Sequence, residues 1–350
     1  MIKERNYGID LLRLVLMFMI CVLHVLGQGG ILASSVDGTM KHSVFWLMEL
    51  FAYCAVDAFA LISGYTATNK TRKYEKLVNI WFQVFFYSFI ITIIFVIIGK
   101  AGNIRSIDII KNALPITFNK YWYMTAYFLL FLAIPILNEL LFKLSENNAK
   151  KTFIMLFVLF TCIGLACDSF ETKAGYSAIW LMALYCIGLL GQRIDVFGKR
   201  KSITLILIWL LCIVGTWFSY VYLDIEKFVN YISPTIVLSG LIMVVLFKRL
   251  KLKGNIISKL APLALGVYLL QLNQVIWDNI IKDAFVYILD KEILLGILWV
   301  LSYASLIFIA GLLVEFIRSK LAKVLKLDLL SKKIVNLIDF ILEKAIIVLK

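Results

Sequence analysis

This chain has few of the residues that mark linkers, disulfide scaffolds or metal sites. Its 350 residues include only four prolines and two histidines, and no stretch is rich in glycine, serine and proline. We therefore expect neither a flexible linker nor a separate water-soluble domain. The six cysteines form no Cys-x-x-Cys pair, which argues against both a disulfide framework and a structural zinc site. Two histidines are too few for a multi-histidine site, so we expect no metal.

Acidic residues are also scarce relative to basic ones. There are 22 of them against 36 lysines and arginines, which gives a formal net charge of +14. In a water-soluble protein this balance would favour nucleic-acid binding. Here the basic residues lie in short segments between long apolar runs, which is the pattern that orients membrane proteins. We therefore expect the lipid bilayer, and not nucleic acid, as a partner.

Apolar residues are abundant, at 62% of the chain with a mean hydropathy of +0.92. A membrane-spanning helix needs about 20 mainly apolar residues. Such segments must be helical, because lipid offers no partner for free backbone groups. We predict an all-α membrane bundle of about ten transmembrane helices. The ten segments are residues 8–28, 43–66, 77–99, 121–142, 152–168, 176–192, 203–223, 231–247, 261–281 and 293–317.

The distribution of lysine and arginine predicts the orientation of these helices. With the N-terminus inside, the inside segments carry most of the basic residues, and the C-terminus is then also cytoplasmic. The outside segment 100–120 is the exception, and residues 106–111 within it are expected to form an interfacial helix. The first apolar run is too long for a cleavable signal and contains Arg13.

The chain is expected to divide into a transmembrane domain, residues 1–319, and a basic tail, residues 320–350. In the tail, lysines alternate with leucine, isoleucine and valine at near-helical spacing. This pattern predicts an amphipathic helix that lies on the inner leaflet.

Charged residues within membrane spans are costly and are therefore candidates for function. In the first span, Arg13 and His24 are 11 residues apart, which places them on one helix face about 16 Å apart along the axis. Asp10, one turn before Arg13, is positioned to pair with it. A buried arginine binds phosphate or carboxylate well, and a histidine acts as a general base. The alternative for His24 is a hydrogen bond that only packs helices.

The second span contains Glu49 and Asp57, with Tyr53 between them. Because this helix runs in the opposite direction, Glu49 lies near the depth of His24 and Asp57 nearer to Arg13. Glu49 is then placed to hold one imidazole nitrogen. Arg13 and Asp57 form either part of a binding site or a purely structural ion pair. His42 is expected to be a solvated loop residue.

Several further segments occur in a characteristic order after the Arg-x10-His pattern. They are RNYGIDLLR (5–13), VDAFALISGY (56–65), YWYM (121–124), PILN (135–138), GYSAIW (175–180) with Tyr185 and Gly188, and GVYLL (266–270). Together they resemble the integral-membrane acyltransferase family 3, O-acetyltransferases of cell-surface glycans, over about residues 5–320. One departure is Gln271, where many family members have a histidine.

The resemblance implies an acyl-CoA co-substrate from the cytoplasm, most simply acetyl-CoA, and no permanently bound cofactor. The acceptor would be a hydroxyl of a cell-envelope or exported polysaccharide. We expect a multi-pass protein of a bacterial plasma membrane that works beside envelope-biosynthesis proteins. The basic segments 69–76, 193–201 and 248–259 would attract the polyanionic donor, or would serve only to set the topology.

Site roles follow from the same resemblance. His24 would be the general base or a transient acyl carrier, oriented by Glu49. Arg13, with Asp10 and Asp57, would hold the donor. The residues expected to contact substrate are Tyr53, Trp122, Tyr123, Tyr127, Tyr268 and Gln271.

Two other functions fit a membrane bundle. A transporter or flippase for an envelope glycan or lipid-linked sugar would use buried charges as a path, and it predicts polar residues in several spans and broken helices. We find no internal repeat, and the charges are concentrated in the first two spans. A non-catalytic membrane sensor is the third hypothesis.

Overall fold

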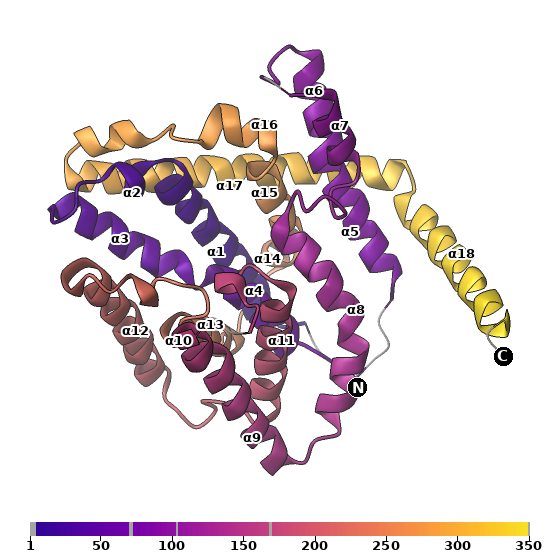
Figure 1. The fold of residues 1–350 in the computed structure, drawn as a ribbon, viewed down its shortest axis with the longest axis horizontal. Coiled ribbons are helices and arrows are strands. Elements are labelled where there is room, and N and C mark those ends of the chain that lie inside the picture. Colours follow the sequence, from indigo (N-terminus) through magenta and orange to yellow (C-terminus); the bar gives the residue numbers. More distant parts are fainter. Residues whose placement is uncertain (1–4, 70–72, 103, 168–169, 349–350) are drawn as a thin grey trace.

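The computed structural model describes residues 5–69, 73–102, 104–167 and 170–348, and within them every regular element is a helix (Figure 1). The first half contains α1 (Tyr7–Leu23), η1 (His24–Gln28), α2 (Ile31–Ser34), α3 (Met40–Tyr53), α4 (Ala55–Tyr65), α5 (Glu75–Phe85), η2 (Phe86–Ile90), α6 (Ile91–Ile97), α7 (Ser106–Ala113), α8 (Trp122–Phe142), α9 (Glu146–Phe157), η3 (Val158–Ile163) and α10 (Gly164–Cys167). The second half contains η4 (Lys173–Gly175), α11 (Ala178–Arg193), α12 (Ser202–Leu223), η5 (Glu226–Phe228), α13 (Pro234–Lys248), α14 (Asn255–Leu260), η6 (Ala261–Leu263), α15 (Ala264–Gln271), α16 (Gln274–Ile276), η7 (Trp277–Ile281), η8 (Val286–Asp290), α17 (Ile293–Val324) and α18 (Leu327–Val348).

The predicted all-α membrane bundle is confirmed at the level of its helices. Among the described residues, seven helices are long and apolar enough to cross a membrane: Tyr7–Ser34, Met40–Tyr65, Glu75–Ile97, Trp122–Phe142, Glu146–Cys167, Ser202–Leu223 and Ile293–Val324. Two predicted spans fall on the shorter apolar helices α11 and α13. The predicted span 261–281 falls on a pair of helices bent by 60°, Asn255–Gln271 and Gln274–Asp290. The number ten and the side of each terminus therefore stay predictions.

Glycines let the central helices approach closely. A Cβ on Gly64 of α4 would lie 1.9 Å from the Tyr185 carbonyl oxygen of α11, and a Cβ on Gly188 of α11 would lie 2.3 Å from the Leu61 carbonyl oxygen. A Cβ on Gly266 of α15 would lie 2.4 Å from the Cβ of Glu315 in α17. Small residues at helix contacts are the usual means of packing helices in lipid, where apolar burial against a partner brings little gain.

Hydrogen bonds gather the basic segments at the end of the bundle where α1 begins. Asn6 donates to the Lys248 carbonyl at 3.0 Å, and Arg5 donates to that of Ser258 at 2.9 Å. Arg249 donates to the Phe197 carbonyl at 2.7 Å. Segments 193–201 and 248–259, both predicted to be cytoplasmic, therefore lie together near the start of α1.

The other end of α1 meets segments that were predicted to lie outside. The Asp283 amide donates to the Gln28 carbonyl at 3.1 Å, and the Phe285 amide donates to that of Gly29 at 3.0 Å. Lys41 donates to the Leu289 carbonyl at 2.5 Å. These segments therefore lie together at the other end of α1 from the basic segments.

His42 is not the solvated loop residue that the sequence suggested. Thr39 caps the following helix through a hydrogen bond from the His42 amide, at 3.3 Å, so α3 begins at Met40 and His42 lies in its first turn. The ring is buried, with Nδ1 2.9 Å from the Ser35 hydroxyl and 3.3 Å from an Asp37 carboxylate oxygen. The prediction was wrong because it began the span at residue 43.

Candidate functional site

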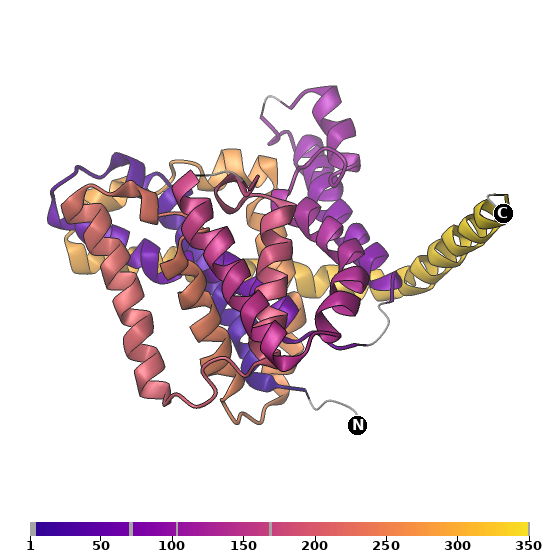
Figure 2. The same cartoon turned by 60° about the horizontal axis from the view of Figure 1, so that its bottom comes forward.

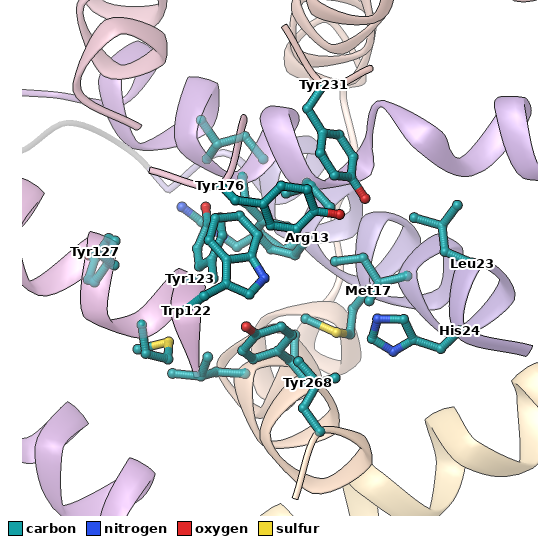
Figure 3. Close-up of a pocket in the computed structure, with 18 of the residues that line it drawn as sticks. Arg13, Met17, Leu23, His24, Trp122, Tyr123, Tyr127, Tyr176, Tyr231 and Tyr268 are labelled. Atoms are coloured by element: carbon teal, nitrogen blue, oxygen red, sulfur yellow. The ribbon is translucent and has the colours of Figure 1, made fainter. Parts of the chain in front are cut away.

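The bundle encloses a cavity of about 600 Å³ that opens between α1, α3, α4, α8 and α15 (Figure 3). Arg13, Met17, Ile20 and His24 form one side of it, at helical spacings of four, three and four residues. These spacings give one continuous stripe along α1. One cavity therefore joins the arginine and the histidine, as the stripe geometry predicts. They are 11 positions apart, which corresponds to about 16 Å along a helix axis.

A network of side chains holds Arg13 at its end of the stripe. Its Nη1 donates to Asp10 Oδ1 at 2.7 Å, and Asp10 Oδ2 accepts a second bond, of 2.5 Å, from Arg5 Nε. Asp10 is buried and does not line the cavity, whereas Arg13 lines it and keeps 35% of its side chain exposed. Asp10 therefore positions the guanidinium from behind, and part of the guanidinium remains available to a ligand.

Asp57 does not pair with Arg13. Its Oδ1 accepts a hydrogen bond of 3.0 Å from Trp180 Nε1 in α11, while Oδ2 has no partner among the described residues. Asp57 is 1% exposed and does not line the cavity. The structural ion pair with Arg13 that the sequence allowed is thus not formed. Asp57 contacts α11 and does not face the cavity in which the acyl-CoA donor would lie.

His24 stands where α1 passes into the π-helical turn η1. Its Nδ1 has no hydrogen-bond partner in the described part of the chain. The indole ring of Trp277 packs edge-on against the imidazole, with centroids 5.9 Å apart and an interplanar angle of 79°. Gln271 is 1% exposed, and its amide lies next to Cys21 and His24 without a hydrogen bond of normal geometry. The imidazole is therefore held mainly by packing.

Glu49 lines the same cavity but makes no hydrogen bond with His24 among the described residues. It is 7% exposed, and its Oε2 has no partner. Its Oε1 lies close to Gly27, where a Cβ would be 3.8 Å away. The expected orienting contact is thus absent, although the carboxylate faces the same space as the imidazole.

Aromatic rings form most of the remaining wall. The five aromatic residues predicted to contact substrate all line the cavity: Tyr53, Trp122, Tyr123, Tyr127 and Tyr268. Tyr123 and Tyr268 have ring centroids 6.1 Å apart, and the Tyr268 hydroxyl has no partner within the described ranges. Gln271 lies behind this wall and does not line the cavity.

Three tyrosine and tryptophan residues of the wall were not assigned to the site from the sequence. Tyr231 stacks on Tyr53 with ring centroids 4.5 Å apart, and the ring centroids of Tyr176 and Trp122 are 4.7 Å apart. Trp277 is the third. Tyr176 belongs to a recognised segment that could have identified it, whereas Tyr231 and Trp277 follow no local pattern that separates them from packing aromatics.

No group of three or more histidine, cysteine, aspartate or glutamate side chains in the described ranges is arranged to hold a metal ion. The charged and polar groups at the cavity include a guanidinium, an imidazole, a carboxylate and phenol hydroxyls, together with the side chains of Gln28 and Ser63. This combination can bind an anionic group at one end and accept or donate a proton at the other.

Fold and site together define a multi-pass helical membrane protein with an internal, aromatic-walled cavity. A family model described as an acyltransferase domain matches residues 6–317. The chain therefore belongs to acyltransferase family 3, as its resemblance suggested, and is a membrane acyltransferase. Comparison with curated proteins and with solved structures finds no match.

Proposed function

We propose that this membrane acyltransferase moves an acetyl group from cytoplasmic acetyl-CoA to a hydroxyl of a cell-envelope or exported polysaccharide. The observation that carries the proposal is the single cavity with Arg13 and His24 on one stripe of α1. An extended donor with phosphates at one end and a thioester at the other suits this arrangement. No permanently bound cofactor takes part.

At the donor end, the Arg13 guanidinium binds a phosphate of CoA, and Asp10 keeps it in place. The basic segments 193–201 and 248–259 lie near this end and raise the local concentration of a polyanion. The segment 69–76 would contribute similarly, although residues 70–72 lie outside the described part of the chain. The pantetheine arm then extends past Met17 and Ile20, which places the thioester near His24.

At the other end, His24 acts as a general base. Its imidazole, which lines the cavity, takes the proton of the acceptor hydroxyl while the hydroxyl oxygen attacks the thioester carbonyl carbon. The resulting tetrahedral intermediate collapses, the carbon–sulfur bond breaks, and the imidazolium returns the proton to the CoA thiolate. The Tyr268 ring, which lines the cavity, contacts the substrate. The other cavity aromatics stack on the sugar ring.

An acyl-imidazole on His24 is the alternative form of the same step. In that case the imidazole nitrogen attacks the thioester carbonyl carbon, the carbon–sulfur bond breaks, and the N–H proton of the acyl-imidazolium passes to the CoA thiolate. The acceptor hydroxyl oxygen then attacks the acyl carbon and the carbon–nitrogen bond breaks. Glu49 faces the same space and would take the acceptor proton and pass it to the departing imidazole. The two routes differ in whether donor cleavage occurs without acceptor.

The test compares His24→Ala and Arg13→Ala with His42→Ala in cells that lack the wild-type gene. His42 is the matched control because it is the other histidine of the chain and does not line the cavity. With equal protein in the membrane, mass spectrometry of envelope polysaccharides should show acetylation lost in the first two variants and kept in the third. Wild-type acetylation in both cavity variants would contradict the proposal.

The transporter hypothesis gains one feature from the structure, the bent helix pair at Gln271 and Gln274. The charged side chains that line the cavity, however, are Arg13 and Glu49, both from the first two predicted spans. Membership of an acyltransferase family accounts for them without transport.

A further inference from the structure

The last helix, α18, leaves the bundle at a turn with one residue in a left-handed backbone conformation. Lys326 lies between α17 and α18 with a φ of 53°, a left-handed conformation that ends a helix and redirects the chain. The first turns of α18 then contact α5. Asn79 donates to Asp328 Oδ1 at 2.8 Å and accepts from the Ser331 hydroxyl at 2.5 Å. Beyond this contact, α18 extends away from the other helices in both views (Figures 1 and 2).

Apolar residues occupy one face of α18. At 100° per residue, one face contains Leu330, Ile334, Ile338, Ile341 and Ala345. The opposite face contains Asp328, Lys332, Asn336, Asp339 and Glu343, together with one exposed apolar residue, Ile346. In the distal half the apolar face has no protein cover, since Ile338 and Ile341 are 47% and 56% exposed. Such a face in water would be unfavourable, so something outside the described chain must cover it.

The position of two lysines, and not an excess of positive charge, favours lipid as the cover. Lysines 320, 323 and 326 precede α18, and within α18 the lysines 332, 333 and 344 are matched in number by Asp328, Asp339 and Glu343. Lys333 and Lys344 project from the border of the apolar face, where a lysine stem can lie along the acyl chains while the ammonium group reaches lipid phosphates. α18 is not among the helices apolar enough to cross a membrane.

We propose that α18 is an interfacial helix whose distal apolar face, formed by Ile338, Ile341 and Ala345, is buried in an anionic leaflet of the membrane that the bundle crosses. The bilayer is within reach because α17, to which α18 is attached, is itself long and apolar enough to span it. The helix lies beyond residue 317, where the match to the acyltransferase domain ends. The inference does not depend on the acyl-transfer chemistry.

The test places a bimane fluorophore on either face of α18 in the full-length protein. Ile341→Cys reports the apolar face and Asp339→Cys the polar face, in a variant whose six native cysteines are replaced by serine or alanine. The parent and both variants must share one elution volume and one thermal midpoint in detergent. Liposomes contain phosphatidylcholine with phosphatidylglycerol, and doxyl-labelled lipid and aqueous iodide serve as the two quenchers.

We expect the Ile341→Cys label to be quenched several-fold more by doxyl lipid than by iodide, and the Asp339→Cys label to show the reverse. The double change Lys333→Gln and Lys344→Gln should lower doxyl quenching at position 341 to the level seen in phosphatidylcholine alone. Equal iodide quenching at both positions would overturn the proposal. Shielding of position 341 accompanied by cross-links between two copies would overturn it in favour of a dimer contact.

Discussion

At the scale of single residues, the cavity separates side chains that line it from side chains that only contact the lining residues. Arg13 and His24 line the cavity, while Asp10 and Gln271 lie behind them and contact them. Trp277 belongs to the first kind, because its ring both lines the cavity and packs edge-on against the imidazole. This double contact makes Trp277 a candidate for setting both the orientation of His24 and the space left for the acyl group.

Replacing Trp277 should therefore change rate and donor choice together. An edge-to-face pair contributes about 0.5–1.5 kcal/mol, so Trp277→Ala should lower kcat with acetyl-CoA by about 2- to 10-fold. The space vacated by the indole should raise the activity with butyryl-CoA relative to acetyl-CoA. Trp277→Phe, which keeps a ring, is the matched control and should remain near wild type. Unchanged kinetics of Trp277→Ala with both donors would argue against this role.

Asp57 offers a different prediction, because it accepts a hydrogen bond from Trp180 and makes none with Arg13. Asp57→Ala leaves a buried indole N–H without its acceptor, which should cost about 1–3 kcal/mol of stability. Asp57→Asn keeps an oxygen acceptor and should cost less. Thermal unfolding in detergent measures this difference. A normal thermal midpoint with a raised KM for the donor would instead restore the donor-binding role that the sequence suggested.

The sequence identifies charged site residues better than aromatic ones. Arg13 and His24 are conspicuous because a charge or an imidazole in an apolar span is rare and costly. Tyr231 and Trp277 have no such contrast in a chain with 14% aromatic residues. Their place in the wall depends on packing between helices that are distant in sequence, such as the stacking of Tyr231 on Tyr53. The expected hydrogen bond between Glu49 and His24 is absent for the same reason. Two residues at the same depth in the membrane need not be in contact, because contact depends on how their helices pack.

At the scale of helices, close packing depends on positions that tolerate no side chain. Hydrophobic runs predicted where the helices lie, but not that α4 and α11 would approach through Gly64 and Gly188. Nor did they predict the break between Gln271 and Gln274. There Asn273 caps α16 by accepting from the amides of Val275 and Ile276, while its side-chain amide donates to the Tyr87 carbonyl at 2.8 Å. A polar group that satisfies free backbone in this way allows a helix to break within a bundle.

Gly64→Ala should therefore destabilise the protein, although it adds only one methyl group. The added Cβ would lie 1.9 Å from the Tyr185 carbonyl oxygen, so α4 and α11 must move apart. Overpacking of this kind costs about 1–3 kcal/mol, and a lower thermal midpoint in detergent should report it. Gly215→Ala in α12 is the control, because its Cβ would meet no atom within 4 Å. Equal midpoints for the two variants would show that the α4–α11 contact is looser than described.

At the scale of the whole molecule, orientation can be tested on one helix. α12 has 22 residues and is about 33 Å long, enough to cross a bilayer. Lys199 precedes it and Asp224 follows it, and both are exposed. In a cysteine-replaced variant, an impermeant maleimide added to intact cells should label Asp224→Cys but not Lys199→Cys. Both should react after permeabilisation.

This pair of labels also determines the side of the N-terminus. Arg249 bonds to Phe197, next to the Lys199 segment, and Asn6 bonds to Lys248, so these three segments share one end of the bundle. If Lys199→Cys is protected in intact cells, the start of α1 and Arg13 face the cytoplasm, where acyl-CoA is made. If Lys199→Cys is labelled instead, the arginine faces outward. A cytoplasmic CoA donor could then not reach it, and the proposed role of Arg13 in donor binding would be wrong.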